Sequence, residues 1–96
     1  MKLDDAAIET RLAECPGWIR TSTADPVLQR AFDCGDFLRS MVFVNAIAEA
    51  AEAANHHPDI LVQYATVTIS LSTHDAGGIT DKDFQLAAII DGLHSS

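Results

Sequence analysis

The stretch from Gly35 to Asn55 constrains the fold of this 96-residue chain more than any other part of the sequence. Its second half is rich in alanine, the residue with the highest helix propensity. Apolar residues recur along it at three- and four-residue steps, which predicts a helix whose apolar stripe needs a sheet to cover it. Pro58 ends this helix at the preceding histidines, because proline pushes the residue before it out of the helical region. The stripe consists of Phe37, Met41, Val44, Ile47 or Ala48, and Ala51.

The strands of that sheet are predicted on both sides of the helix. Residues 66–72 alternate apolar and hydroxyl side chains, so one face of this strand is buried and the other is solvated. Residues 60–64 predict a neighbouring strand. Two earlier strands, residues 18–23 and 27–32, flank a turn that contains Pro26.

Shorter helices are predicted near both ends of the chain. Residues 4–14 carry apolar residues at helical spacing, with an aspartate at the start that can cap them. Thr80-x-x-Asp83 has the pattern of a capping box, and Gly92 stands where a helix often ends. The predicted order is helix-strand-strand-helix-strand-strand-helix, in one domain over residues 1–96. We expect an α+β fold, a four-stranded antiparallel sheet with three helices packed on one face.

The amino-acid composition indicates which partners the protein can bind and which cellular compartment it occupies. Six Lys and Arg stand against fourteen Asp and Glu, so the formal net charge is −8 at pH 7. Neither a phosphate backbone nor an acidic lipid surface attracts such a carboxylate excess, so we expect no direct nucleic-acid binding and no membrane partner. The two cysteines form no CxxC pair, and the N-terminus has no apolar run typical of a signal peptide. These features predict a cytoplasmic protein.

Three histidines fall at the ends of predicted elements. His56 and His57 close the long helix, and His74 follows the alternating strand. Imidazole is the usual proton donor and acceptor near neutral pH, and a helix C-terminus favours its protonated form by about 0.3–1 kcal/mol. Glu52, one turn before His56, can orient or charge it. Because these element ends can lie close together in a four-stranded sheet, we expect the three imidazoles to converge.

The pattern Glu52-x3-His56-His57-Pro58-x5-Tyr64-x9-His74-x8-Asp83 resembles the signature of the pterin-4a-carbinolamine dehydratases. Members of this family are also known as dimerisation cofactors of a homeodomain transcription factor. The resemblance runs from Trp18 through Leu93. It implies a 4a-hydroxytetrahydrobiopterin dehydratase, a hydro-lyase that turns a 4a-hydroxytetrahydropterin into quinonoid dihydropterin and water and so recycles tetrahydrobiopterin. It also implies that no metal or organic prosthetic group is needed.

Carried over by position, the resemblance implies a role for each residue of the pattern and for some of its neighbours. His56 and His74 become general acid/base groups, and His57 chiefly binds the substrate. Pro58, Thr73, Asp75 and Ala76 line the pterin pocket, and Glu52, Asn55, Tyr64 and Asp83 support it. Three positions depart from the family: Ile60 replaces a common Trp, Ala76 a common Cys, and Lys82 an Arg. These departures bear on substrate preference more than on acid/base chemistry.

Other interpretations of the same residues remain open. Asp83 can be a plain helix cap, Tyr64 can simply pack, and Glu52 can be part of a solvated helix face. A zinc-type site would draw on the three histidines with Asp75 or Glu52, although adjacent histidines rarely aim at one ion.

Two questions about function and assembly also stay open. The alternative function is a non-catalytic binding or assembly module on the same fold, such as a transcriptional coactivator or an enzyme-assembly factor. We also expect a homodimer or homotetramer, because an open sheet leaves unpaired edges that a second copy can extend. The identity of the pterin stays undetermined by the sequence.

Overall fold

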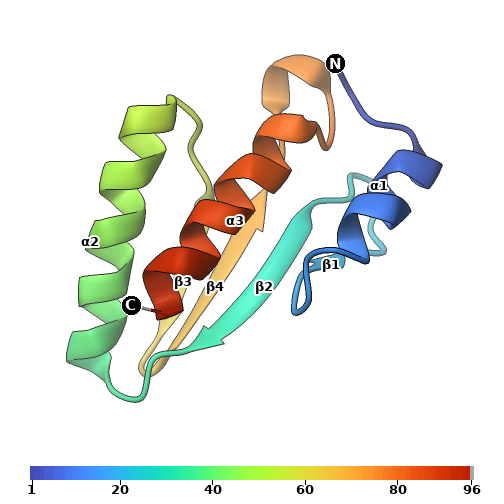
Figure 1. The fold of residues 1–96 in the computed structure, drawn as a ribbon. Coiled ribbons are helices and arrows are strands. Elements are labelled where there is room, and N and C mark those ends of the chain that lie inside the picture. Colours follow the sequence, from blue (N-terminus) through green and yellow to red (C-terminus); the bar gives the residue numbers. More distant parts are fainter. Residues whose placement is uncertain (96) are drawn as a thin grey trace.

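A computed structural model describes residues 1–95 of the chain (Figure 1). Its strands form one antiparallel sheet in the order β1-β2-β4-β3, and its helices precede, interrupt and follow them. The predicted α+β fold and the predicted order of elements are confirmed. The elements are α1 (Asp5–Leu12), β1 (Ile19–Arg20), β2 (Leu28–Asp33), α2 (Phe37–Ala54), β3 (Asp59–Gln63), β4 (Thr66–Leu71), the 3-10 helix η1 (His74–Ala76) and α3 (Asp81–Ser95).

The register of β2 against β4 makes one face of the sheet apolar. Leu28 lies opposite Leu71 and Phe32 lies opposite Val67, and all four side chains are buried. The helices cover this face; in Figure 1, α3 lies in front of the strands and α2 stands to its left. Buried side chains from all three helices join those of β2 and β4 in one core cluster. The alternation predicted for residues 66–72 therefore marks the central strand that carries the core.

In the first hairpin, the first strand is shorter than predicted and the second is displaced by one residue. β1 contains only Ile19 and Arg20, and β2 begins at Leu28. Thr21 closes the hairpin instead of extending it: its N–H donates to the carbonyl of Val27 at 2.9 Å, and its Oγ1 accepts from the Val27 N–H at 3.0 Å. A side-chain hydrogen bond thus replaces a ladder bond, because threonine hydroxyls compete with the backbone at turns.

The buried stripe of α2 matches the predicted one at Ile47 and Ala51 but differs from it in the first half of the helix. Asp36 caps the helix by accepting the Arg39 N–H at 2.8 Å. Ser40 then takes a buried position, where its hydroxyl contacts the carbonyls of Asp36 and Tyr64 at 3.0 and 2.8 Å. As a result Phe37 at the start of the predicted stripe is 53% exposed. The buried residues of α2 are Ser40, Phe43, Ile47 and Ala51.

The end of α3 was also predicted wrongly, because the helix continues through Gly92 to Ser95. Tertiary contacts hold this last turn in place. His94 Nε2 donates to the carbonyl of Asp33 at 2.9 Å, and its ring packs against Phe32 with 5.0 Å between centroids. Asp91 accepts hydrogen bonds from Trp18 Nε1 and Arg30 Nη1, both at 2.9 Å. Within residues 1–95, no helix combines the length and the apolarity that a membrane crossing needs.

Candidate active site

The C-terminal cap of α2 turns the chain immediately before His56. Asn55 adopts the left-handed conformation, with φ of 50°. Its N–H donates to the carbonyl of Glu52 at 3.2 Å, and the N–H of His56 donates to the carbonyl of Ala51 at 3.1 Å. This pair of bonds is the Schellman arrangement that ends many helices. Asn55 is therefore the residue that turns the chain, and His56 is the first side chain beyond the turn.

Asp83, which is fully buried, links His56 to the start of α3 and to the end of β4. Its Oδ1 lies 2.5 Å from Nε2 of His56. Its Oδ2 accepts the backbone N–H of Thr80 at 2.8 Å, as the predicted capping box requires, and the hydroxyl of Thr73 at 3.0 Å. The same carboxyl group therefore caps a helix and holds an imidazole.

This contact determines which nitrogen of His56 is engaged. Nε2 of His56 shares a hydrogen bond with Oδ1 of Asp83, while Oδ2 of the same carboxyl group accepts from Thr73 and Thr80. No residue among 1–95 makes a hydrogen bond to the Nδ1 of His56. That nitrogen is the one available for proton transfer to a ligand.

A cavity of about 390 Å³ lies at the end of the sheet where β4 finishes. This volume is within the range of small-molecule sites. His74 lies on its wall with an exposed imidazole that makes no side-chain hydrogen bond to residues 1–95. Of the three histidines in the pattern, His74 is the one that lines the cavity. Other lining residues are Lys2, Arg20, Asp59, Thr73 and Gly78.

The remaining pattern residues fall into two places. His57 Nε2 lies 3.0 Å from Glu52 Oε2, and both side chains are exposed, outside the cavity lining. Pro58 connects this pair to β3. Asp75 and Ala76 lie in η1, next to His74 but not among the lining residues.

Tyr64 lies at the tip of the β3–β4 hairpin, at the far end of β3 from Pro58. The strand between them has five residues, which span about 16 Å at the usual rise. The Tyr64 side chain is 72% exposed. The structure thus brings Thr73, His74, Asp83 and His56 together and leaves Tyr64 apart from them.

The groups with shifted pKa values lie outside this cavity. Burial raises the pKa of the Cys15 thiol, helped by the charge of Asp91, and burial also raises the pKa of Cys34. Both thiols therefore stay protonated at neutral pH, as expected of inert cysteines. The hydrogen bond and charge of Arg11 lower the pKa of Asp81. Among residues 1–95, no group of three His, Cys, Asp or Glu is arranged to hold a metal ion.

The fold and the cavity define a class: small α+β domains with histidines at one end of an antiparallel sheet. Residues 1–93 match the family model described as "Pterin 4 alpha carbinolamine dehydratase", and the chain belongs to this family. A protein of Picosynechococcus named "Putative pterin-4-alpha-carbinolamine dehydratase" is 47% identical over 96% of this chain and 97% of its own. A protein of the same name from Thermomicrobium roseum is 49% identical over 98% of both chains.

Two solved structures resemble this one. A transcriptional coactivator/pterin dehydratase from Brucella melitensis superposes with a TM-score of 0.93 at 26% identity, over 98% of this chain and 99% of that one. A pterin dehydratase-like protein described as a RuBisCO assembly factor in the alpha-carboxysome gives a TM-score of 0.70 at 25% identity, over 83% and 92% of the two chains.

Proposed function

We propose that this protein is a cytoplasmic hydro-lyase that converts a 4a-hydroxytetrahydropterin to quinonoid dihydropterin and water in tetrahydrobiopterin recycling. The observation that carries the proposal is the connection from His56 through Asp83 to Thr73, whose neighbour His74 lies on the cavity wall. One imidazole, that of His74, lies on the cavity wall, and a second, that of His56, is bonded to the carboxyl group that also holds the cavity-lining Thr73. Membership of the pterin carbinolamine dehydratase family supports the choice of substrate.

The proposed reaction needs one proton donor and one proton acceptor. The lone pair of the ring nitrogen beside C4a forms the new C=N bond, and the C–O bond breaks with its electrons going to oxygen. Hydroxide leaves poorly, so an imidazolium protonates the departing oxygen and water leaves instead. A second imidazole takes the proton from the ring nitrogen. We assign these two roles to His74, on the cavity wall, and to His56 through its Nδ1.

The other pattern residues bind or position the substrate in this proposal. Thr73 lines the cavity itself. His57, held by Glu52, and Pro58, Asp75 and Ala76 lie outside that lining and contact the part of the pterin that extends beyond it. Asp83 positions His56, and Asn55 sets the turn from which His56 extends. Tyr64 supports the site only if the substrate or a second copy of the chain reaches the hairpin tip.

The direct test is dehydration of freshly generated carbinolamine, followed by ultraviolet absorbance. We expect the protein to accelerate the reaction over buffer and the His56→Ala variant to lose about 10²–10⁴-fold of that acceleration. The variant must retain the wild-type circular dichroism spectrum for the comparison to count. Wild-type protein that is no faster than buffer would contradict the proposal.

The alternative is a binding or assembly module on the same fold, because one structural neighbour is a transcriptional coactivator as well as a pterin dehydratase and the other is a RuBisCO assembly factor. A module of this kind needs the fold and an interaction surface, and it places no demand on proton transfer. The same assay separates the two functions, because a pure scaffold leaves the rate of dehydration at that of buffer.

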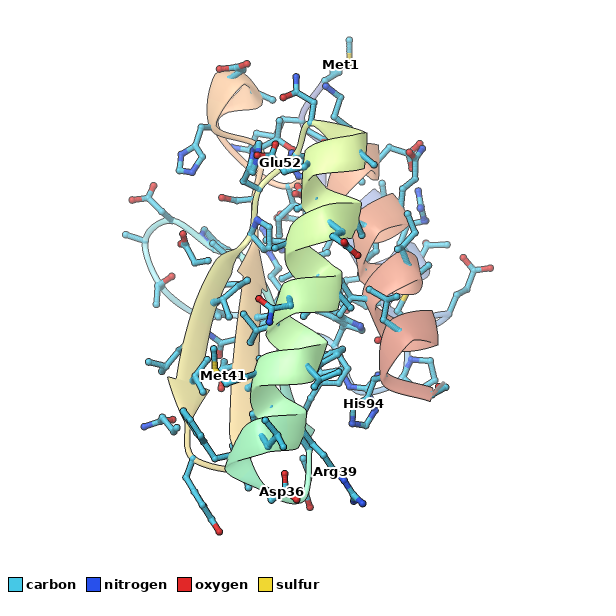
Figure 2. The ribbon with its side chains drawn as sticks, turned by 90° about the vertical axis from the view of Figure 1, so that its left-hand side faces the viewer. Met1, Asp36, Arg39, Met41, Glu52 and His94 are labelled. Carbon is cyan, nitrogen blue, oxygen red and sulfur yellow. The ribbon has the colours of Figure 1, made fainter. Side chains whose placement is uncertain are left out.

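We further propose that the chain forms a homodimer or homotetramer. Phe37, Leu38 and Val42 are 53%, 74% and 63% exposed on the N-terminal half of α2. Figure 2 shows Arg39 near that end of α2 and Glu52 near the other end. Two α2 helices packed antiparallel would cover the apolar residues and set the arginine of each copy near the acidic end of its partner.

Leu38→Glu is expected to shift the protein toward monomer, because it places a charge in the apolar patch that this contact covers. Sedimentation velocity at micromolar concentration measures the change. Ile89→Glu is the matched control, since Ile89 is also exposed (47%) but lies on α3. If Leu38→Glu keeps the mass of the wild-type assembly, α2 is not the contact.

A further inference from the structure

Two of the six lysines and arginines of this acidic chain line the candidate cavity. They are Lys2, from the N-terminal segment, and Arg20, from the end of β1. With a net charge of −8 the chain has few cations, so their presence at one cavity calls for a physical reason. Neither residue belongs to the histidine pattern.

Arg20 is only weakly neutralised by the protein. Its Nη2 donates to Asp5 Oδ1 at 2.7 Å, but the side chain of Asp5 is 84% exposed while that of Arg20 is 27% exposed. Solvent screens such a carboxylate strongly. The Nε of Arg20 is buried and has no hydrogen-bond partner within residues 1–95. The guanidinium is therefore partly exposed at the cavity and is not fully hydrogen-bonded by the protein.

Lys2 is held at the same cavity by packing. The N–H of Leu3 donates to the carbonyl of Ile79 at 2.9 Å, which anchors the N-terminal segment beside η1. The Lys2 stem lies over Gly78, where an added Cβ would come within 2.9 Å of Lys2 Cε. No carboxylate of residues 1–95 lies within 4.0 Å of its ammonium group. A glycine thus makes room for an unpaired cation.

The cavity also has two acidic lining residues, Asp25 and Asp59, and neither forms an ion pair with Lys2 or Arg20. A carboxylate matches the 2-amino and N3–H donors of a pterin ring, because it accepts two parallel hydrogen bonds. Guanidinium and ammonium groups match an anion instead. A ligand that satisfies both kinds of group carries ring donors and a negative charge.

From these contacts we propose that the substrate is a reduced pterin whose side chain bears an anionic group, a phosphate ester or a carboxylate, bound by Arg20 and Lys2. This inference rests on the proposed function for the pterin ring and extends it to the side chain. Arg20 and Lys2 are binding residues in this assignment, and the histidines keep the chemistry.

The test compares three stable pterins that differ at the 6-position: a neutral hydroxymethyl group, its phosphate ester, and a carboxylate. Binding is measured by titration calorimetry at low salt, and the result is the affinity of each anionic pterin relative to the neutral one. We expect at least one anionic pterin to bind about tenfold more tightly. The phosphate and carboxylate arms show which anion fits.

Four variants sharpen the comparison. Arg20→Gln is expected to bring the affinity ratio close to one, and Gly78→Ala to lower it by displacing Lys2. Asp5→Asn is expected to raise the ratio, because it removes the carboxylate that competes for Arg20. A purely structural role of Arg20 does not predict that increase. Arg39→Gln, which removes the same charge from the distant α2, is the matched control and keeps the wild-type ratio.

The outcomes separate this inference from the proposed function. Equal affinity for neutral and anionic pterins contradicts the proposal that the substrate carries an anionic group, and it does not bear on the proposed dehydration activity. If no pterin binds, the proposed function fails, and inorganic phosphate then tests the subsite by itself. A phosphate-dependent shift of the Arg20 Nε–H resonance supports an anion subsite, and an unchanged resonance overturns it.

Discussion

Replacing Asp83 with asparagine is expected to lower the kcat of carbinolamine dehydration by about 10²–10⁴-fold. An asparagine side chain has one carboxamide oxygen, whereas Asp83 uses both of its oxygens in hydrogen bonds, one with His56 and the other with Thr73 and Thr80. His56 then loses its acceptor or is forced into the other tautomer. The free energy of unfolding should also fall by about 1–3 kcal/mol, because buried donors lose their partner.

Asp81→Asn is the matched control for this variant. Asp81 lies in the same first turn of α3, but it is exposed and bonds to Arg11 and Gln85 outside the cavity. It should keep the wild-type kcat. Because Asp83 does not line the cavity, the loss in Asp83→Asn should appear in kcat with little change in KM. If Asp83→Asn folds and keeps kcat within about twofold of wild type, Asp83 acts only as a helix cap.

Replacing His74 with alanine is expected to lower kcat/KM by about 10²–10⁴-fold while leaving stability nearly unchanged. The imidazole is exposed and makes no hydrogen bond to residues 1–95, so its removal leaves no buried group unpaired. If His74 and His56 serve opposite faces of the pterin, one stereoisomer of the 4a-carbinolamine should be slowed more than the other. Stopped-flow absorbance on the separated isomers measures both rates.

His94→Gln provides the matched control for the His74 variant. Its amide can still donate to the carbonyl of Asp33, and it lies at the opposite end of the sheet from His74. Dehydration rates should stay at the wild-type level. Equal slowing of both stereoisomers by His74→Ala would rule out the two-faced arrangement, and an unchanged rate would remove His74 from the proton transfer.

Local sequence signals predicted the parts of the fold that depend on local interactions. The alternation of residues 66–72 identified β4, and Thr80-x-x-Asp83 identified the start of α3, since both patterns act over a few residues. Gly92 misled the prediction because the contacts of Asp91 and His94 come from distant residues. The phase of α2 likewise depends on Ser40, whose partner Tyr64 is 24 positions away.

In the candidate site, too, the motif predicted some residues, whereas the positions of others depend on contacts between distant parts of the chain. The spacing of the motif named His56, His74 and Asp83, which the structure connects through Thr73. Whether each imidazole lines the cavity depends on side-chain partners, and the motif does not specify them. Arg20 lies outside the motif and reaches the site because β1 pairs with the start of β2. Tyr64 is excluded from the cluster by the length of β3, which its spacing from Pro58 already implied.

Asp83 both caps the start of α3 and bonds to His56, so the proposed chemistry depends on this helix end remaining folded. When the first turn of α3 frays on heating, the carboxyl group leaves His56 as well as Thr80. Such local melting requires less energy than separating the strands of the sheet. Thermal inactivation should therefore begin below the global unfolding temperature, and a change that tightens this turn would extend the working range of the enzyme without touching its reactive groups.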